Sequence, residues 1–129
     1  MWRAHGIPLA FPVAADFAGT AEVGELVRLN DDGEVTNTPG TGLYFPLIDC
    51  VQFGQEQNAS VTVAGIGKGL VEDANGITVN TPLTVGANGK GLVATSDETK
   101  AIGYAMGTPK GNGDFIPYLL TPKLGTSQY

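Results

Sequence analysis

The chain has 129 residues, a length typical of one domain, and 42% of them are hydrophobic, which is enough to build a core without disulfides. Its 7 basic and 13 acidic residues give a net charge of −6 at pH 7, and the basic residues are scattered. Binding to nucleic acid or to an anionic membrane requires clustered Lys and Arg, so we expect neither partner. The 19 glycines and 8 prolines indicate many turns and short elements.

The first 18 residues form a predicted N-terminal arm. Pro8 and Pro12 fix φ and remove backbone donors, which favours an extended conformation over a helix. The segment has too little periodicity to bury its large apolar side chains internally, and exposed apolar clusters usually mark an interface. We therefore predict an interface at Trp2, Ile7, Leu9, Phe11 and Phe17. The alternative is that the arm folds back over its own core.

The same N-terminal segment has the basic and apolar composition of a weak signal peptide. The two prolines interrupt its apolar region, so we expect an ordinary chain start rather than a cleaved leader. No apolar stretch reaches the roughly 18 residues that a membrane-spanning helix requires.

Residues 19–122 form the predicted body, which reads as strands and turns. Apolar alternation on both sides of Asp32-Gly33 predicts a hairpin with a two-residue type I′ turn. Asn88-Gly89 predicts a second hairpin. Only residues 96–100 have the capping residues of a short helical turn. Residues 123–129 are a predicted C-terminal tail.

Two further segments of the body have distinctive patterns. Residues 65–69 are rich in glycine and predict a tight turn where backbone approaches backbone. Residues 77–85 alternate like a strand, with Ile77 and Val79 on the face of Leu83. Pro82 interrupts this strand and indicates an edge position or a bulge.

The two hairpins belong to an internal repeat. Val27-Arg28-Leu29 followed by Gly33 matches Leu83-Thr84-Val85 followed by Gly89, at an offset of about 56 residues. The predicted fold is therefore all-β. We expect a compact small β-barrel or sandwich-like body built of two related β-hairpin units, with an extended N-terminal arm and little helix.

No catalytic or cofactor site is predicted. His5 lies in the arm, a poor platform for a general base, and Cys50 lies in an apolar run that indicates a buried structural thiol. Residues 65–69 lack the spacing of a phosphate-binding loop, and residues 30–34 lack that of a helix–loop–helix calcium site. We expect a protein that is not an enzyme and holds no cofactor or metal.

Several motifs recur in one order over residues 20–120. They are Val23-Gly24-Glu25-Leu26-Val27-Arg28-Leu29, Asp32-Gly33-Glu34-Val35, residues 79–85, Asn88-Gly89-Lys90, Ala101-Ile102-Gly103-Tyr104-Ala105 and Gly113-Asp114-Phe115-Ile116. This arrangement resembles the capsid decoration (cement) proteins of tailed bacteriophages. The final strand departs from the family pattern at Pro117, which predicts one-sided pairing, and neither the arm nor the tail matches it.

The resemblance implies a non-enzymatic virion protein that binds the outer surface of the expanded capsid. Such proteins clamp neighbouring major capsid proteins and stabilise the head against DNA pressure, often as trimers at local three-fold positions. The expected partners are the major capsid protein and further copies of this chain. The arm would contact capsid protein or a neighbouring subunit by strand addition or by filling a groove.

Two alternatives share the predicted all-β character. One is another phage structural module, such as a tail or baseplate β-domain, which particle stoichiometry would distinguish from a cement protein. The other is a secreted carbohydrate-binding β-domain, which requires a cleaved leader and an aromatic binding platform.

Overall fold

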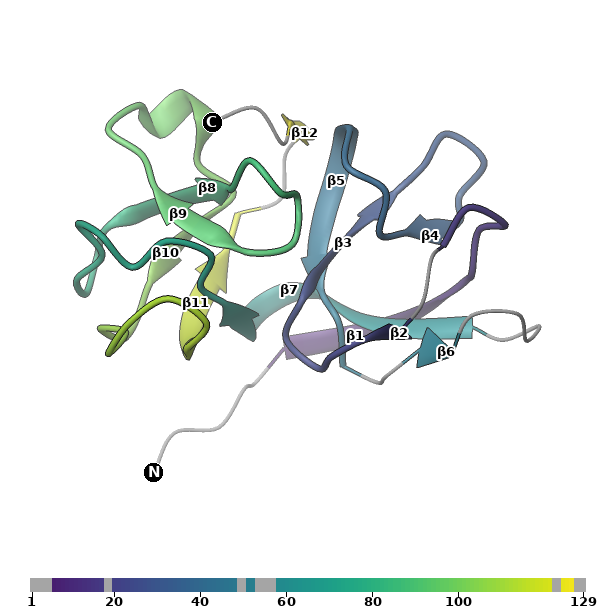
Figure 1. The fold of residues 1–129 in the computed structure, drawn as a ribbon, viewed down its shortest axis with the longest axis horizontal. Helices are drawn as coiled ribbons and strands as arrows, with labels where there is room; N and C mark the ends of the chain where they lie inside the picture. The colour runs from purple at the N-terminus through teal and green to yellow at the C-terminus, as the bar shows by residue number, and fades with distance from the viewer. Residues whose placement is uncertain (1–5, 18–19, 49–50, 53–57, 122–123, 127–129) are drawn as a thin grey trace.

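Strands provide nearly all the regular structure of the protein (Figure 1). The computed structural model describes residues 6–17, 20–48, 51–52, 58–121 and 124–126. The elements are β1 (Gly6–Pro12), β2 (Thr20–Ala21), β3 (Leu26–Leu29), β4 (Val35–Thr36), β5 (Thr41–Pro46), β6 (Val51–Gln52), β7 (Asn58–Leu70), β8 (Pro82–Val85), β9 (Leu92–Ala94), the 3₁₀ turn η1 (Glu98–Lys100), β10 (Gly103–Ala105), β11 (Phe115–Leu120) and β12 (Leu124–Thr126). The prediction of an all-β fold with little helix is confirmed.

The strands of the described residues form two principal antiparallel sheets. A six-stranded sheet has the order β1-β7-β11-β10-β8-β9, and a four-stranded sheet has the order β12-β5-β3-β4. The short strands β2 and β6 pair separately. Figure 1 shows two groups of strands side by side, β3 to β5 in one and β8 to β11 in the other. We call them the first and second units.

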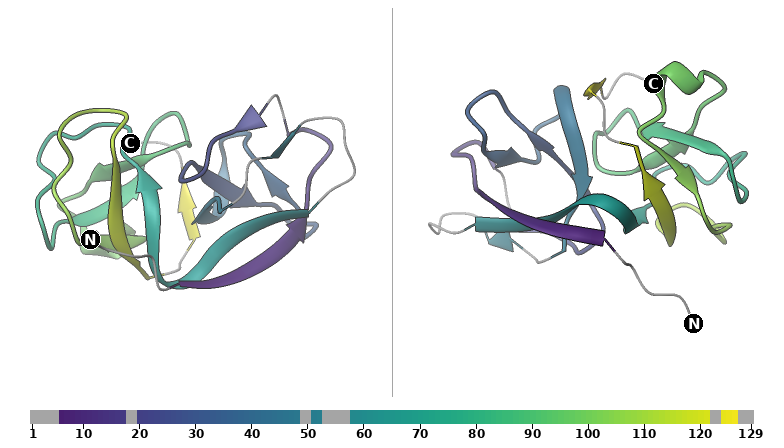
Figure 2. Two further views of the ribbon diagram at one scale, coloured as in Figure 1. Left: turned by 90° about the horizontal axis from the view of Figure 1, so that it is seen from below. Right: turned by 180° about the vertical axis from the view of Figure 1, so that it is seen from behind.

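The long strand β7 joins the two units. Its first half pairs with β1, from Asn58 to Gly65, and its second half pairs with β11, from Ile66 to Leu70. Figure 2 shows β7 running along β1 and then turning up beside β11. The predicted tight turn at residues 65–69 is therefore wrong, because these glycines continue a strand. Close packing is nevertheless present: a Cβ at Gly67 would lie 2.9 Å from Cγ of Pro46.

The first predicted hairpin is present, but its turn is longer than predicted. Leu29 pairs with Val35, and the N–H of Asn30 donates to the carbonyl of Glu34 at 2.8 Å. The N–H of Gly33 donates to the carbonyl of Asn30 at 3.1 Å, and Gly33 has a φ of 75°. This is a three-residue loop in which a type I turn is followed by a left-handed glycine. A type I′ turn would need two residues with positive φ.

The second hairpin repeats this arrangement. Gly89 has a φ of 71°, and its N–H donates to the carbonyl of Gly86 at 2.9 Å. The loop is closed by the N–H of Gly86, which donates to the carbonyl of Gly91 at 2.8 Å, so it is one residue longer. The N–H of Leu26 donates to the carbonyl of Lys90 at 2.9 Å, which connects the first unit to the second hairpin.

The strand predicted over residues 77–85 begins only at Pro82. Residues 74–77 and 78–81 form two successive turns, closed by N–H donation from Ile77 to Ala74 and from Thr81 to Thr78. As a result Ile77 is buried whereas Val79 is exposed, instead of sharing one face. Pro82 is the first residue of β8, which lies between β10 and β9 and is not an edge strand. A strand's first residue tolerates the missing N–H.

Pro117 does not make the pairing of β11 one-sided, contrary to the prediction. β11 lies between β7 and β10 and pairs with both. The carbonyl of Pro117 accepts from the N–H of Met106, one residue beyond the end of β10. Because N–H and C=O of one residue point to the same side of an antiparallel strand, the missing donor costs no bond to β7.

One hydrophobic core runs through both units. Its largest fully buried side chains are Phe17, Leu26, Leu47, Leu83, Leu92, Ile116 and Tyr118. The segment predicted as a separate arm contributes to this core. β1 pairs along β7, Val13 bridges Val35, and the N–H of Ala14 donates to the carbonyl of Val35 at 2.9 Å. Residues 6–17 therefore pack as part of the body.

Candidate interaction surface

The structure separates the predicted interface residues into three groups. Ile7 and Leu9 are 62% and 50% exposed on β1. Phe11 is half-buried and packs against the core. Phe17 is fully buried, so its prediction as an interface residue is wrong: the chain after β1 turns along β4 and carries it inside. Trp2, like His5 and Cys50, lies outside the described residues.

β1 is an edge strand along most of its length, and its free side lacks a hydrogen-bond donor at Pro8. The carbonyl of Ser60 in β7 accepts from the N–H of Ile48, on the side of β7 away from β1. Ser60 pairs with Ala10, so the backbones of Ala10 and Pro8 face the free edge, whereas β4 covers this side of the strand after Pro12, where Val13 bridges Val35. Proline has no N–H to give to a further strand. This edge therefore offers apolar side chains but is poorly built for strand addition.

A second apolar surface lies on the six-stranded sheet, on the side away from the core. Buried and exposed residues alternate along β11, so that Ile116, Tyr118 and Leu120 point inward. Strand pairing then fixes which residues of neighbouring strands share the outward side. We call this surface the outer sheet face; it comprises Ile66, Lys68, Leu70, Pro82, Tyr104, Met106, Phe115, Pro117 and Leu119.

The rows of the outer sheet face follow directly from the register. Its longest row runs across four strands as Ile66, Leu119, Tyr104 and Pro82. Leu119 is 43% exposed, and Met106, at the end of β10, is 46% exposed. An antiparallel sheet with one face on the core usually has polar residues on its other face. Here the outward-pointing side chains are also apolar, apart from Lys68. The outer face therefore exposes apolar side chains that another layer of the protein would ordinarily cover.

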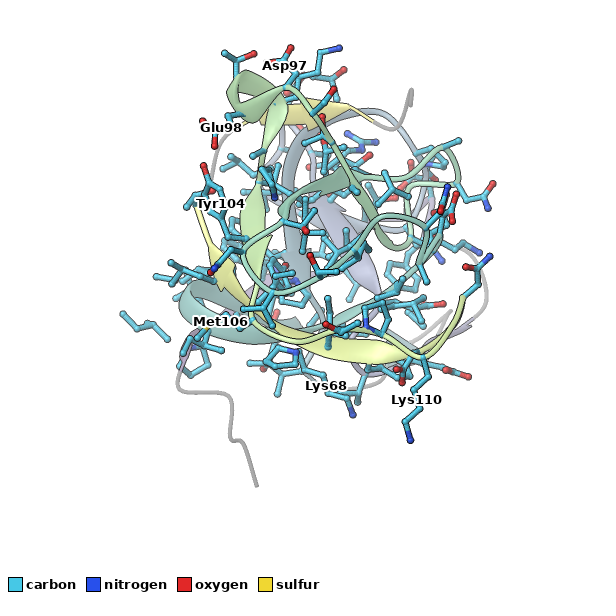
Figure 3. The ribbon with its side chains drawn as sticks, turned by 90° about the vertical axis from the view of Figure 1, so that its left-hand side faces the viewer. Lys68, Asp97, Glu98, Tyr104, Met106 and Lys110 are labelled. Atoms are coloured by element: carbon cyan, nitrogen blue, oxygen red, sulfur yellow. The ribbon has the colours of Figure 1, made fainter. Side chains whose placement is uncertain are left out.

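Lys68 supplies the charge of the outer sheet face. Its Nζ lies 4.8 Å from the centroid of the Phe115 ring, a cation–π contact that holds the ammonium over the face. Figure 3 shows Lys68 at the lower edge of the view, with Met106 and Tyr104 on the left and Asp97 and Glu98 at the top, far from Lys68. None of the residues that pairing assigns to this face is acidic.

A tight turn borders this face at the start of β11. The carboxylate of Asp114 accepts from the N–H groups of Lys110 and Phe115, both at 2.9 Å. These backbone hydrogen bonds hold the pKa of Asp114 below its usual value. The turn at residues 111–114 is the one that links the last two predicted strands, and it fixes the direction in which β11 begins.

Metal-ligating clusters and membrane-spanning helices are both absent from the described residues. Among them, no group of three or more His, Cys, Asp or Glu side chains is placed to hold a metal ion. Nor does that part of the chain contain a helix long and apolar enough to cross a membrane. The strongest pKa shift is that of Tyr118, whose complete burial raises the pKa of the phenol.

A solved bacteriophage protein has a similar fold. The fold is similar to that in "The crystal structure of head fiber gp8.5 N base in bacteriophage phi29", with a TM-score of 0.61 and 20% sequence identity. The similarity covers 89% of this chain and 95% of that one. No protein-family model matches the sequence, and no curated protein matches it significantly. At this identity the similarity establishes the fold.

The outer sheet face was not predicted from the sequence, although one signal for it is present. Residues 115–120 are apolar at every position, whereas a half-exposed strand should alternate with polar residues. Such a run predicts two apolar faces. Recognising the complete surface also requires the pairing of β11 with β7 and β10, which local sequence does not reveal.

Proposed function

We propose that the protein is a non-enzymatic structural component of a tailed-bacteriophage virion, made in the bacterial cytoplasm and bound to the outer surface of the expanded capsid. The fold similarity to the N base of a phage head fiber carries this proposal, because it extends over nearly the whole of both chains. The motifs at residues 20–120 support the same role independently, through their resemblance to capsid decoration proteins.

In this role the protein cements neighbouring major capsid proteins and stabilises the head against DNA pressure. One core through both units gives the rigidity that a connector between capsid proteins requires. The net charge of −6 suits a position outside the shell, away from the packaged DNA. We further propose that the protein is a homo-oligomer, as a trimer, and that Ile7 and Leu9 contribute contacts to capsid protein or to an adjacent subunit.

A second candidate function is the base on which a head fiber is mounted. The name of the structural neighbour favours it, since that protein is the N base of such a fiber. A mounting base and a cement protein both bind the capsid. They differ in consequence, because a cement protein strengthens the shell whereas a base carries a further protein.

The decisive experiment is co-sedimentation of the purified protein with expanded, undecorated capsids of its source phage, with the bound copies counted. The cement role predicts saturable binding near one copy per capsid subunit, a higher temperature of capsid disruption, and weak binding to unexpanded procapsids. Sparse saturation without stabilisation would favour the fiber base. Absence of binding to expanded capsids would contradict both.

A further inference from the structure

We propose that the outer sheet face is the surface that docks on the capsid, and that Lys68 pairs there with a carboxylate of the major capsid protein. This inference rests on the proposed function. It differs from the sequence-based prediction, which assigned the interface to the N-terminal segment.

The outer sheet face exposes apolar side chains. Leu119 and Met106 are nearly half exposed, and they lie in or beside rows of half-buried apolar side chains. Val79, 53% exposed, precedes Asn80, whose N–H donates to the carbonyl of Ala105 at 2.7 Å, so Val79 borders the same area. Contiguous apolar surface of this kind on a soluble protein marks an interaction site.

The charge of Lys68 requires a complementary charge on the partner. Lys68 lies at the edge of this apolar surface, on β7, with its ammonium over the ring of Phe115. Among the described residues, no carboxylate forms an ion pair with Lys68. Covering the face would remove water from the ammonium, which costs free energy unless the partner supplies an opposite charge. The fitting partner surface is therefore apolar, with a carboxylate opposite Lys68.

This chemistry disfavours a second copy of the chain as the occupant. Two copies docked face to face would bring two Lys68 side chains into one apolar interface, and no paired residue of the face is acidic. The carboxylate of Asp114, in the bordering turn, already accepts from the N–H groups of Lys110 and Phe115. The partner must be a surface of different composition. Under the proposed function, the exterior of the capsid shell is the surface that the protein meets.

The test compares capsid binding by variants that alter the face and by matched controls. Leu119→Asp and Lys68→Glu place a negative charge on the face, and each should weaken binding at least about tenfold. Ala87→Asp and Lys90→Glu place the same negative charges at exposed residues of the loop between β8 and β9, outside the face, and should bind within about twofold of the unmodified protein. Lys68→Arg should retain binding, and thermal unfolding would verify that each variant folds.

Salt provides a second measurement. Raising ionic strength should weaken binding of the unmodified protein more than that of Lys68→Met, because only the former has the ion pair to be screened. Equal capsid binding by all variants would overturn this inference and leave the proposed function intact. Loss of self-association by Leu119→Asp with unchanged capsid binding would also overturn it. Failure of the unmodified protein to bind capsids would overturn the proposed function and the inference together.

Discussion

Gly103 lies directly against the ring of Tyr118: a Cβ atom at residue 103 would come within 2.5 Å of Cδ2 of the tyrosine. Gly69 lies against the same ring, where a Cβ would be 2.7 Å from Cε1. β7, β11 and β10 are adjacent in the sheet, so a glycine on each neighbouring strand leaves room for this large buried side chain. The packing of the second unit therefore depends on the absence of two methyl groups.

Gly103→Ala should destabilise the protein by about 1–3 kcal/mol, because a methyl group in a filled core forces side chains and backbone to shift. Gly111→Ala is the matched control, since a Cβ there meets nothing within 4 Å. Urea unfolding at neutral pH measures both. Equal stability of the two variants would show that the Tyr118 ring moves aside without cost.

Tyr118→Phe should leave the free energy of unfolding unchanged or raise it by up to about 1 kcal/mol. The phenol oxygen of Tyr118 is buried and has no hydrogen-bond partner among the described residues, so its removal loses no bond and ends a desolvation cost. Urea unfolding tests this directly. A marked loss of stability would indicate that the hydroxyl has a partner, such as a buried water.

The same burial predicts how stability depends on alkaline pH. The pKa of Tyr118 is raised in the folded state, so above the ordinary value of 10.0 the unfolded chain loses this proton while the folded protein keeps it. The contribution of Tyr118 is complete below pH 10 and declines as the pH rises further. Unfolding free energies measured across this range should fall less steeply for Tyr118→Phe than for the unmodified protein.

Two substitutions in the predicted arm should change the stability of the protein by very different amounts. Phe17→Ala removes a fully buried ring and should cost about 3–5 kcal/mol, whereas Ile7→Ser alters a side chain that is 62% exposed and should change stability by about 0.5 kcal/mol or less. Urea unfolding separates these outcomes. If Phe17→Ala were as stable as Ile7→Ser, the segment would not pack on the body as described.

These contrasts show which features local sequence could predict. Both hairpins were predictable because Gly33 and Gly89 supply the left-handed conformation that their turns require. The burial of Phe17 was not, because it depends on the pairing of β1 with β7, some 50 residues away. The path of β7 was also hidden, since glycines that normally indicate a turn here allow a strand to pass closely between Pro46 and Leu120.

Pro8 allows a test of how the free edge of β1 is protected from pairing with another chain. Pro8 directs its backbone to the free side of the strand, where an N–H would otherwise invite another chain to pair. The variant Pro8→Ala restores this donor without adding charge or bulk. We expect it to self-associate at concentrations where the unmodified protein has a constant oligomeric state, because Ile7 and Leu9 would then lie on an edge able to form a continuous ladder. Light scattering over a concentration series measures this, with Pro109→Ala, in the loop after β10, as the control. If Pro8→Ala behaves like the control, side-chain packing or strand twist protects the edge, and Pro8 serves only to hold β1 extended.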